Sequence, residues 1–96
     1  MNIKKIKEKL EVLKPLLRER FKVQTIGLFG SYVRGEEKKT SDLDILVDFS
    51  ETISLFKFIE LEDFLTQELE VKVDLVMRDA LKPRIKDSIL KEAVYV

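Results

Sequence analysis

Two aspartates separated by one residue, Asp42 and Asp44, are the side chains of this sequence best placed to do chemistry. On a strand, the alternation of side chains would put both carboxylates on one face, roughly 6–7 Å apart. Two anions this close repel each other, by about 1 kcal/mol in water and several times more in a partly dry cleft. Mg²⁺ would reverse the sign of that energy, because it binds one or two carboxylates together with water and phosphate oxygens. Taken alone, such a pair is more often a solvated acidic strand start.

A third aspartate, Asp74, interrupts the apolar segment VKVDLVM at residues 71–77. A strand would be more stable with threonine or valine at this position. If this strand lies beside the strand that contains Asp44, Asp74 joins Asp42 and Asp44 on one face. Three convergent carboxylates are the ligand set of a two-metal site, which holds the attacking and the leaving oxygen of a phosphoryl displacement.

The segment GLFGSYVRG, residues 27–35, offers a place for a phosphate. Gly30 has no Cβ and lets the backbone approach a ligand, while Ser31 adds a hydroxyl and an N–H. We expect one helical turn from Ser31 to Arg34 that ends at Gly35, with N–H groups that can bind an anion. Taken alone, the segment is more simply a strand-to-helix turn. For Arg34, both a phosphate contact and an ion pair with a surface glutamate remain open.

Composition excludes several other chemistries. The chain has 96 residues, which suits one small domain, and its 18 basic residues balance 18 acidic ones, so no net charge favours binding to nucleic acid or a membrane. It contains neither cysteine nor histidine, which excludes disulfides, thiolate nucleophiles, Ser-His-Asp catalysis and ordinary zinc sites. No apolar run reaches the length of a membrane span, and the lysine-rich start lacks a signal peptide's apolar segment. We therefore expect a cytoplasmic protein.

The elements that must position these residues alternate between helix and strand patterns. Residues 2–20 carry an amphipathic helical stripe, and Pro15 predicts a kink or a break within it. Residues 23–29 and 42–49 are predicted strands. Val12 and Leu16 lie outside the helical stripe. Two interpretations remain: they are scattered surface residues, or they form a patch that faces a partner. In the second strand one face is predicted to pack on the core: Leu43, Ile45, Val47 and Phe49.

The second half of the chain continues the alternation. Ser54 is the predicted N-cap of a helix over residues 54–69. Phe64 lies outside the core stripe of this helix. It is either a contact residue for a partner or a second core contact. A strand over 71–77 and a helix that begins near Pro83 follow, and the final VYV has no clear form. The predicted core side of the 54–69 helix is formed by Leu55, Phe58, Ile59, Leu65 and Leu69, widened by Phe56 and Leu61. The expected fold is α/β (α+β), a small mixed sheet flanked by helices.

The combined pattern is sharper than its parts. The glycine-serine turn is followed, after ten intervening residues, by Asp-Leu-Asp and then by a lone aspartate in a strand. This sequence resembles the polymerase-beta-like nucleotidyltransferase superfamily, and within it the minimal nucleotidyltransferases (MNT). The resemblance covers essentially the whole chain, as a single domain over residues 1–96. The pieces that carry it are FGS at 29–31, RG at 34–35, SDLD at 41–44, VDLV at 73–76 and the closing ILKEAVYV.

The resemblance implies a role for each of these residues. Asp42 and Asp44 would be paired metal ligands, and Asp74 would complete one metal site and accept or orient the proton of the incoming hydroxyl. Gly30 and Ser31 would hold the triphosphate of ATP, with Arg34 as an auxiliary contact. The cofactor would be Mg²⁺, with two ions expected, and the reaction would transfer a nucleotide to a hydroxyl and release pyrophosphate.

The resemblance also implies a partner. MNT proteins are antitoxins of two-gene modules whose toxin is a HEPN-domain ribonuclease, which the MNT protein silences by adding AMP to a tyrosine. A chain of this length has no segment to spare for an acceptor domain, so a second subunit, as in a homo-oligomer, or another protein must bring the acceptor. Two alternatives remain: an antitoxin that only binds the HEPN toxin, and a nucleotidyltransferase subunit that acts on a small molecule.

Overall fold

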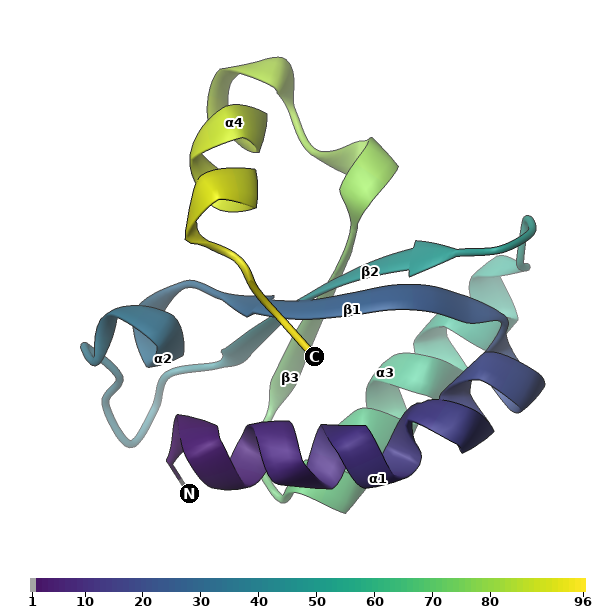
Figure 1. Cartoon of the computed structure of the whole chain (residues 1–96), viewed down its shortest axis with the longest axis horizontal. Helices are drawn as coiled ribbons and strands as arrows, with labels where there is room; N and C mark the ends of the chain where they lie inside the picture. The colour runs from purple at the N-terminus through teal and green to yellow at the C-terminus, as the bar shows by residue number, and fades with distance from the viewer. Residues whose placement is uncertain (1) are drawn as a thin grey trace.

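One mixed sheet forms the centre of the molecule (Figure 1). The structure is a computed structural model and describes residues 2–96. The strand order is β3-β2-β1-β4. β1 (Val23–Phe29) pairs antiparallel with both β2 (Leu43–Phe49) and β4 (Val94–Tyr95), whereas β3 (Val73–Met77) pairs parallel with β2. Helices α1 and α3 lie on one side of the sheet and α4 on the other.

The first helix, α1 (Ile3–Phe21), begins at Asn2, whose side chain accepts a hydrogen bond from the Lys5 N–H at 3.0 Å. It continues through Pro15, so of the predicted kink or break, the break does not occur. Pro15 and Glu11, whose carbonyl loses its partner, both lie on the exposed side, where water can hydrate the free carbonyl. The opposite side is buried against the sheet through Ile6, Leu10, Leu17 and Phe21.

Helix α3 (Leu55–Leu69) begins at the predicted N-cap, because the Ser54 hydroxyl accepts the Lys57 N–H at 3.1 Å. One side of its second half is buried, but in its first turns Leu55, Phe56 and Ile59 are 71%, 85% and 46% exposed, so their predicted place in the core was wrong. Periodicity places these residues on one side of the helix but does not say where the covering elements end. The other predicted core residues of this helix, Phe58, Leu61, Leu65 and Leu69, are buried or partly buried, and Phe64 joins them. Phe64 packs on the Phe21 ring at 5.7 Å between centroids, as a core contact.

The alternation of β2 follows the prediction. Leu43, Ile45 and Val47 are buried on the side of α1 and α3, and Phe49 is partly buried against the same core. Asp44 and Asp48 belong to the opposite face, and both are half-buried. One face of this strand therefore packs on the core, and the other carries Asp44 and Asp48 on either side of the buried Leu46.

The remaining elements surround the acidic end of the sheet. A single turn, α2 (Ser31–Arg34), ends at Gly35 as predicted. After β3, the 3₁₀ turn η1 (Arg78–Ala80) leads into α4 (Pro83–Glu92), which has Pro83 in its first turn. The closing VYV forms the edge strand β4 and then donates the Val96 N–H to the Ile26 carbonyl at 3.0 Å. Within residues 2–96, no helix has the length and apolar character needed to cross a membrane.

Candidate active site

Asp44 and Asp74 lie next to each other in the sheet. They are direct partners in the parallel register of β2 and β3, and on its other side Asp44 is opposite Phe29 of β1. In a parallel pair, side chains in register point to the same face, which puts the two carboxylates together. Asp44 is half-buried, whereas Asp74, on the edge strand, is exposed. The arrangement places one carboxylate inside the site and the other at its mouth.

Asp42 lies one residue before β2 and is held less tightly. Its Oδ2 is 4.0 Å from the Nζ of Lys72, whose side chain is largely exposed, while the Asp42 side chain is partly exposed. In the described part of the chain no three acidic side chains converge closely enough to form a ready-made metal site. The structure thus brings Asp44 and Asp74 together and leaves Asp42 nearby, where its charge still acts on Asp44.

The electrostatics of Asp44 test whether a cation fits here. Burial, followed by the charge of Asp74, a hydrogen bond with Asp74 and the charge of Asp42, raises the pKa of Asp44 to about 6. Arg34 opposes this shift only weakly. Without a cation, the site therefore disfavours the ionised form of Asp44 beside the charges of Asp42 and Asp74. A bound divalent cation would stabilise that ionised form. An all-oxygen donor set of carboxylates suits Mg²⁺, so the residues present fit the ion that the sequence predicts.

Gly30 brings the backbone of the turn against Asp44. Its φ is +81°, a conformation that L side chains rarely adopt, and a Cβ at this position would lie 2.0 Å from Asp44 Oδ2. No other residue type can occupy this position without displacing the carboxylate. The glycine-serine turn and the aspartates, which are separate motifs in the sequence, form one site in space.

Arg34 is held by two glutamates. Its Nη1 donates to Glu92 Oε1 at 2.7 Å, and its Nε donates to Glu36. The other oxygen of Glu92 accepts the Gly30 N–H at 3.0 Å. This N–H and then the Arg34 guanidinium hold the pKa of Glu92 below its usual range. Of the two roles that the sequence left open for Arg34, the ion pair is present; contact with a phosphate stays a prediction.

Glu62 and Thr66 also support the site. β3 is an edge strand, and its outward N–H groups are satisfied by side chains of α3: Leu75 donates to Glu62 Oε2 at 2.8 Å, and Val73 donates to Thr66 Oγ1 at 3.1 Å. The two donors, Val73 and Leu75, are the neighbours of Asp74 in the chain. Their bonds therefore fix the backbone that carries Asp74 and cover an edge that could otherwise pair with another chain.

Glu62, Thr66 and Glu92 were not predicted as site residues from the sequence. Glu62 and Thr66 follow an ordinary polar pattern on a helix, and no spacing relates them to a strand further along the chain. Glu92 lies within ILKEAVYV, one of the pieces that carries the family resemblance, and this was the one available signal.

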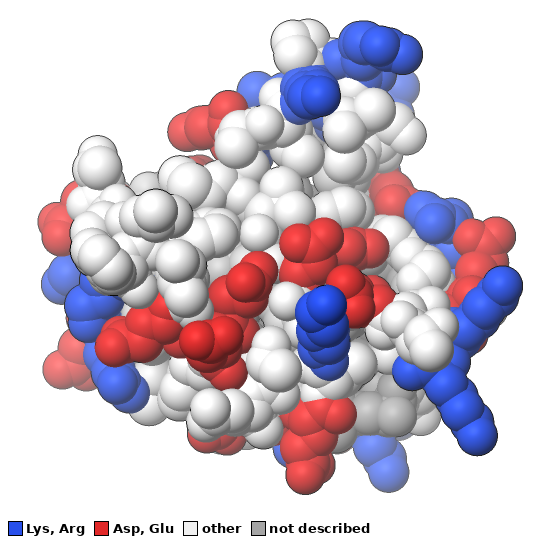
Figure 2. Space-filling model, turned by 180° about the vertical axis from the view of Figure 1, so that it is seen from behind, with Lys and Arg blue, Asp and Glu red and all other residues white. Residues whose placement is uncertain are grey.

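A cleft of about 390 Å³ opens over the two aspartates. Phe29, Asp44 and Asp74 form its floor, and Ile85 and Ile89 of α4 form a wall. Seen from behind, the molecule has acidic side chains gathered across the middle of its surface, while most of the Lys and Arg side chains in view lie towards its edges (Figure 2). The cleft combines two carboxylates and Lys82 with an apolar wall, a combination that suits a metal-bound nucleotide.

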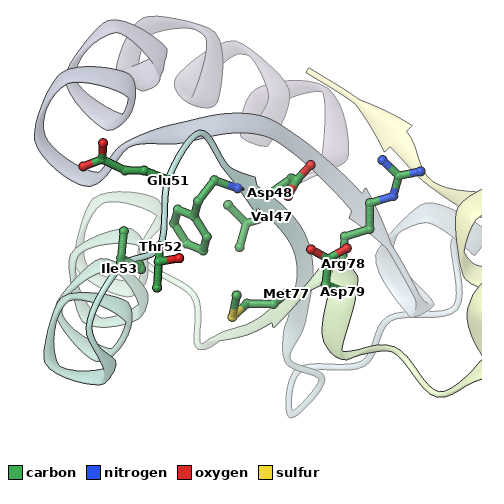
Figure 3. Close-up of a pocket in the computed structure, with 9 residues that line it drawn as sticks. Val47, Asp48, Glu51, Thr52, Ile53, Met77, Arg78 and Asp79 are labelled. Carbon is green, nitrogen blue, oxygen red and sulfur yellow. Dashed lines mark hydrogen bonds between the residues drawn. The ribbon is translucent and has the colours of Figure 1, made fainter.

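A second pocket, of about 280 Å³, lies at the other end of β2 and β3. Figure 3 shows Val47 and Met77 inside it, with Asp48, Arg78 and Asp79 at one side. None of the predicted site residues lines this pocket. The candidate active site is therefore the cleft over Asp44 and Asp74.

The fold and this site together define a nucleotidyltransferase. Residues 3–96 match the family described as the nucleotidyltransferase domain, so the chain belongs to that family. It is 54% identical over 96 residues to the protein adenylyltransferase MntA of Thermococcus cleftensis, an alignment that covers 100% of this chain and 97% of the relative.

Solved structures agree with this assignment. A minimal nucleotidyltransferase superposes with a TM-score of 0.83 at 34% identity, over 98% of this chain and 95% of the other. A toxin–antitoxin structure with AMP-PNP gives a TM-score of 0.73 at 31% identity, over 91% and 70% of the two chains. A tri-AMPylated HEPN toxin of Shewanella oneidensis in complex with its MNT antitoxin gives 0.64 at 26% identity, over 91% and 66%. The predicted fold and the resemblance to minimal nucleotidyltransferases are confirmed.

Proposed function

We propose that this chain is a Mg²⁺-dependent antitoxin that transfers AMP from ATP to a tyrosine of a cognate HEPN-domain toxin. The observation that carries the proposal is the close approach of Gly30 to Asp44, which is itself in register with Asp74. It unites a turn suited to phosphate with carboxylates suited to a metal. The names of the relatives support the rest: an adenylyltransferase that acts on protein, and an MNT antitoxin bound to an AMPylated HEPN toxin.

The carboxylates are the proposed metal ligands. Asp42, Asp44 and Asp74 would hold one or two Mg²⁺ ions, with Asp42 exchanging its contact with Lys72 for the metal. When bound, Mg²⁺ would stabilise the negative charge that develops on the α-phosphate and on the departing pyrophosphate. The protein's own contribution is to hold these oxygens at the edge of the sheet, with Asp44 kept rigid by strands on both sides.

The turn is the proposed triphosphate site. The Val33 and Arg34 N–H groups bond to the Gly30 carbonyl, and the Gly30 N–H bonds to Glu92. These bonds leave the N–H groups of Ser31 and Tyr32, together with the Ser31 hydroxyl, to bind the phosphate oxygens. Gly30 contributes by its lack of a Cβ, which lets the Asp44 carboxylate lie directly against the turn.

Asp74 is the proposed partner of the acceptor. Because it is exposed at the mouth of the cleft, a tyrosine on another protein can reach it without entering the core. The tyrosine oxygen would attack the α-phosphorus while the bond to the bridging oxygen of the β-phosphate breaks. The phenolic proton would pass to Asp74, AMP would remain on the tyrosine, and pyrophosphate would leave.

The test is to incubate the protein with ATP, Mg²⁺ and its co-expressed HEPN partner, and to locate added AMP by mass spectrometry of peptides. We expect AMP on a tyrosine of the partner, its loss in Asp44→Asn, and no change in Asp63→Asn, a matched substitution at an exposed position of α3. Silencing of the toxin without any AMP, unchanged in Asp44→Asn, would instead identify a binding antitoxin. AMP found only on a small molecule would contradict the protein acceptor.

A further inference from the structure

Helix α4 forms a wall of the cleft and yet is poorly anchored. It supplies Ile85 and Ile89 to the cleft, but none of its residues from Pro83 to Glu92 is buried. In Figure 1 it stands away from the sheet, on the side opposite α1 and α3. A helix without a buried side chain gains little from packing, so other contacts must determine its position.

Glu92, the last residue of α4, makes such a contact. Its two carboxylate oxygens each accept a hydrogen bond from the glycine-serine turn, one from the Gly30 N–H at 3.0 Å and one from Arg34 Nη1 at 2.7 Å. Its side chain is only 22% exposed. Charge-assisted bonds of this kind are about twice as strong as neutral ones, and using both oxygens fixes the direction of the carboxylate.

We propose that Glu92 is a positioning residue, which holds the turn at Gly30 in its triphosphate-binding conformation and keeps α4 against the cleft. The proposal rests on the proposed function, because it concerns how the same site binds ATP. Glu92 makes no hydrogen bond with Asp44 or Asp74; its partners are Gly30 and Arg34. Glu92 acts on the site through Gly30, whose backbone lies against Asp44. It also acts through Arg34, because their ion pair holds the guanidinium beside the turn.

The consequence is a specific kinetic pattern. The triphosphate contacts the turn both in the ground state and in the transition state, so loosening the turn removes binding that is common to both. For Glu92→Ala we expect a rise of about tenfold in the KM for ATP and a fall of less than about threefold in kcat. Glu92→Gln keeps an oxygen for the Gly30 N–H and loses the charge beside Arg34, so its KM should rise by only about threefold.

Amide hydrogen exchange of Gly30, followed by NMR without nucleotide, tests the bridge directly. We expect exchange at least about tenfold faster in Glu92→Ala than in the wild type, and no change in Glu11→Gln, an exposed substitution on α1. Equal exchange in Glu92→Ala and the wild type would overturn the proposal. If Glu92→Ala does not fold, Glu92→Gln and Arg34→Gln replace it, and in a double-mutant cycle their effects on KM should be less than additive.

The two measurements separate this inference from the proposed function. If the wild type does not use ATP, the proposed function fails, and the exchange of Gly30 still decides whether Glu92 fixes the turn. If ATP is used and Glu92→Ala lowers kcat while its KM stays the same, Glu92 does not act on triphosphate binding and the proposal is wrong.

Discussion

Replacing Asp44 by asparagine should abolish the reaction and stabilise the metal-free protein. The pKa of Asp44 is raised from 3.8 to about 6, because burial and the neighbouring carboxylates oppose its charge. At about 1.4 kcal/mol for each pKa unit, a shift of roughly two units sets an upper limit of about 3 kcal/mol. The carboxyl group is only half-buried, and solvent screening reduces the expected gain to about 1 kcal/mol. Asparagine is nearly isosteric with aspartate and carries no charge, so the substitution removes the burial and charge repulsion that disfavour the ionised Asp44.

The pH dependence follows from the direction of this shift. A carboxyl group whose pKa is higher in the folded state binds its proton more tightly when folded, so the cost is absent below about pH 3.8 and complete above about pH 6. Urea unfolding in EDTA should therefore show Asp44→Asn more stable than the wild type at pH 7.5, with the difference shrinking towards pH 4. Asp63→Asn, on the exposed side of α3, should show no such trend. An Asp44→Asn protein that is equally or less stable at pH 7.5 would refute this explanation.

Three further substitutions test the supports of the site. Gly30→Ala should cost about 2–4 kcal/mol in urea unfolding and abolish transfer, because its Cβ meets Asp44 and its φ is positive; retained activity would contradict the close approach. Glu62→Ala should cost about 1–2 kcal/mol and speed the amide exchange of Leu75, and an unchanged exchange rate would show that the bond to β3 is unimportant. Ser54→Ala should lower the free energy of unfolding by about 1 kcal/mol, through loss of the cap on α3, and leave the KM for ATP unchanged; a raised KM would link this distant helix start to the site.

The local features of the site were predictable because each follows from a short pattern. Alternation in β2 predicted the buried Leu43, Ile45 and Val47 and the opposite face of Asp44. The serine before α3 predicted its cap, and a glycine predicted the end of α2. The neighbouring positions of Asp44 and Asp74 needed one further assumption, that β2 and β3 lie side by side, and the register confirms it.

What the sequence could not predict depends on contacts between distant segments. Glu92 reaches Gly30 across 62 positions, and no periodicity connects them. The exposed start of α3 and the pairing of β4 with β1 depend on where neighbouring elements end, which local patterns do not encode. Asp42 is a further example. Strand alternation placed it on the same face as Asp44, but it could not indicate the contact of Asp42 with Lys72.

The most direct test of the central claim compares two labelled forms of ATP. The protein, Mg²⁺ and the HEPN partner are incubated with ATP labelled at the α-phosphate or at the γ-phosphate, and the label on the partner is measured. Transfer of a nucleotide predicts that the α label appears on the partner and that the γ label leaves with pyrophosphate. With Asp44→Asn, no label should appear on the partner and no pyrophosphate should be released. Appearance of the γ label on the partner would mean phosphoryl transfer and would contradict the account.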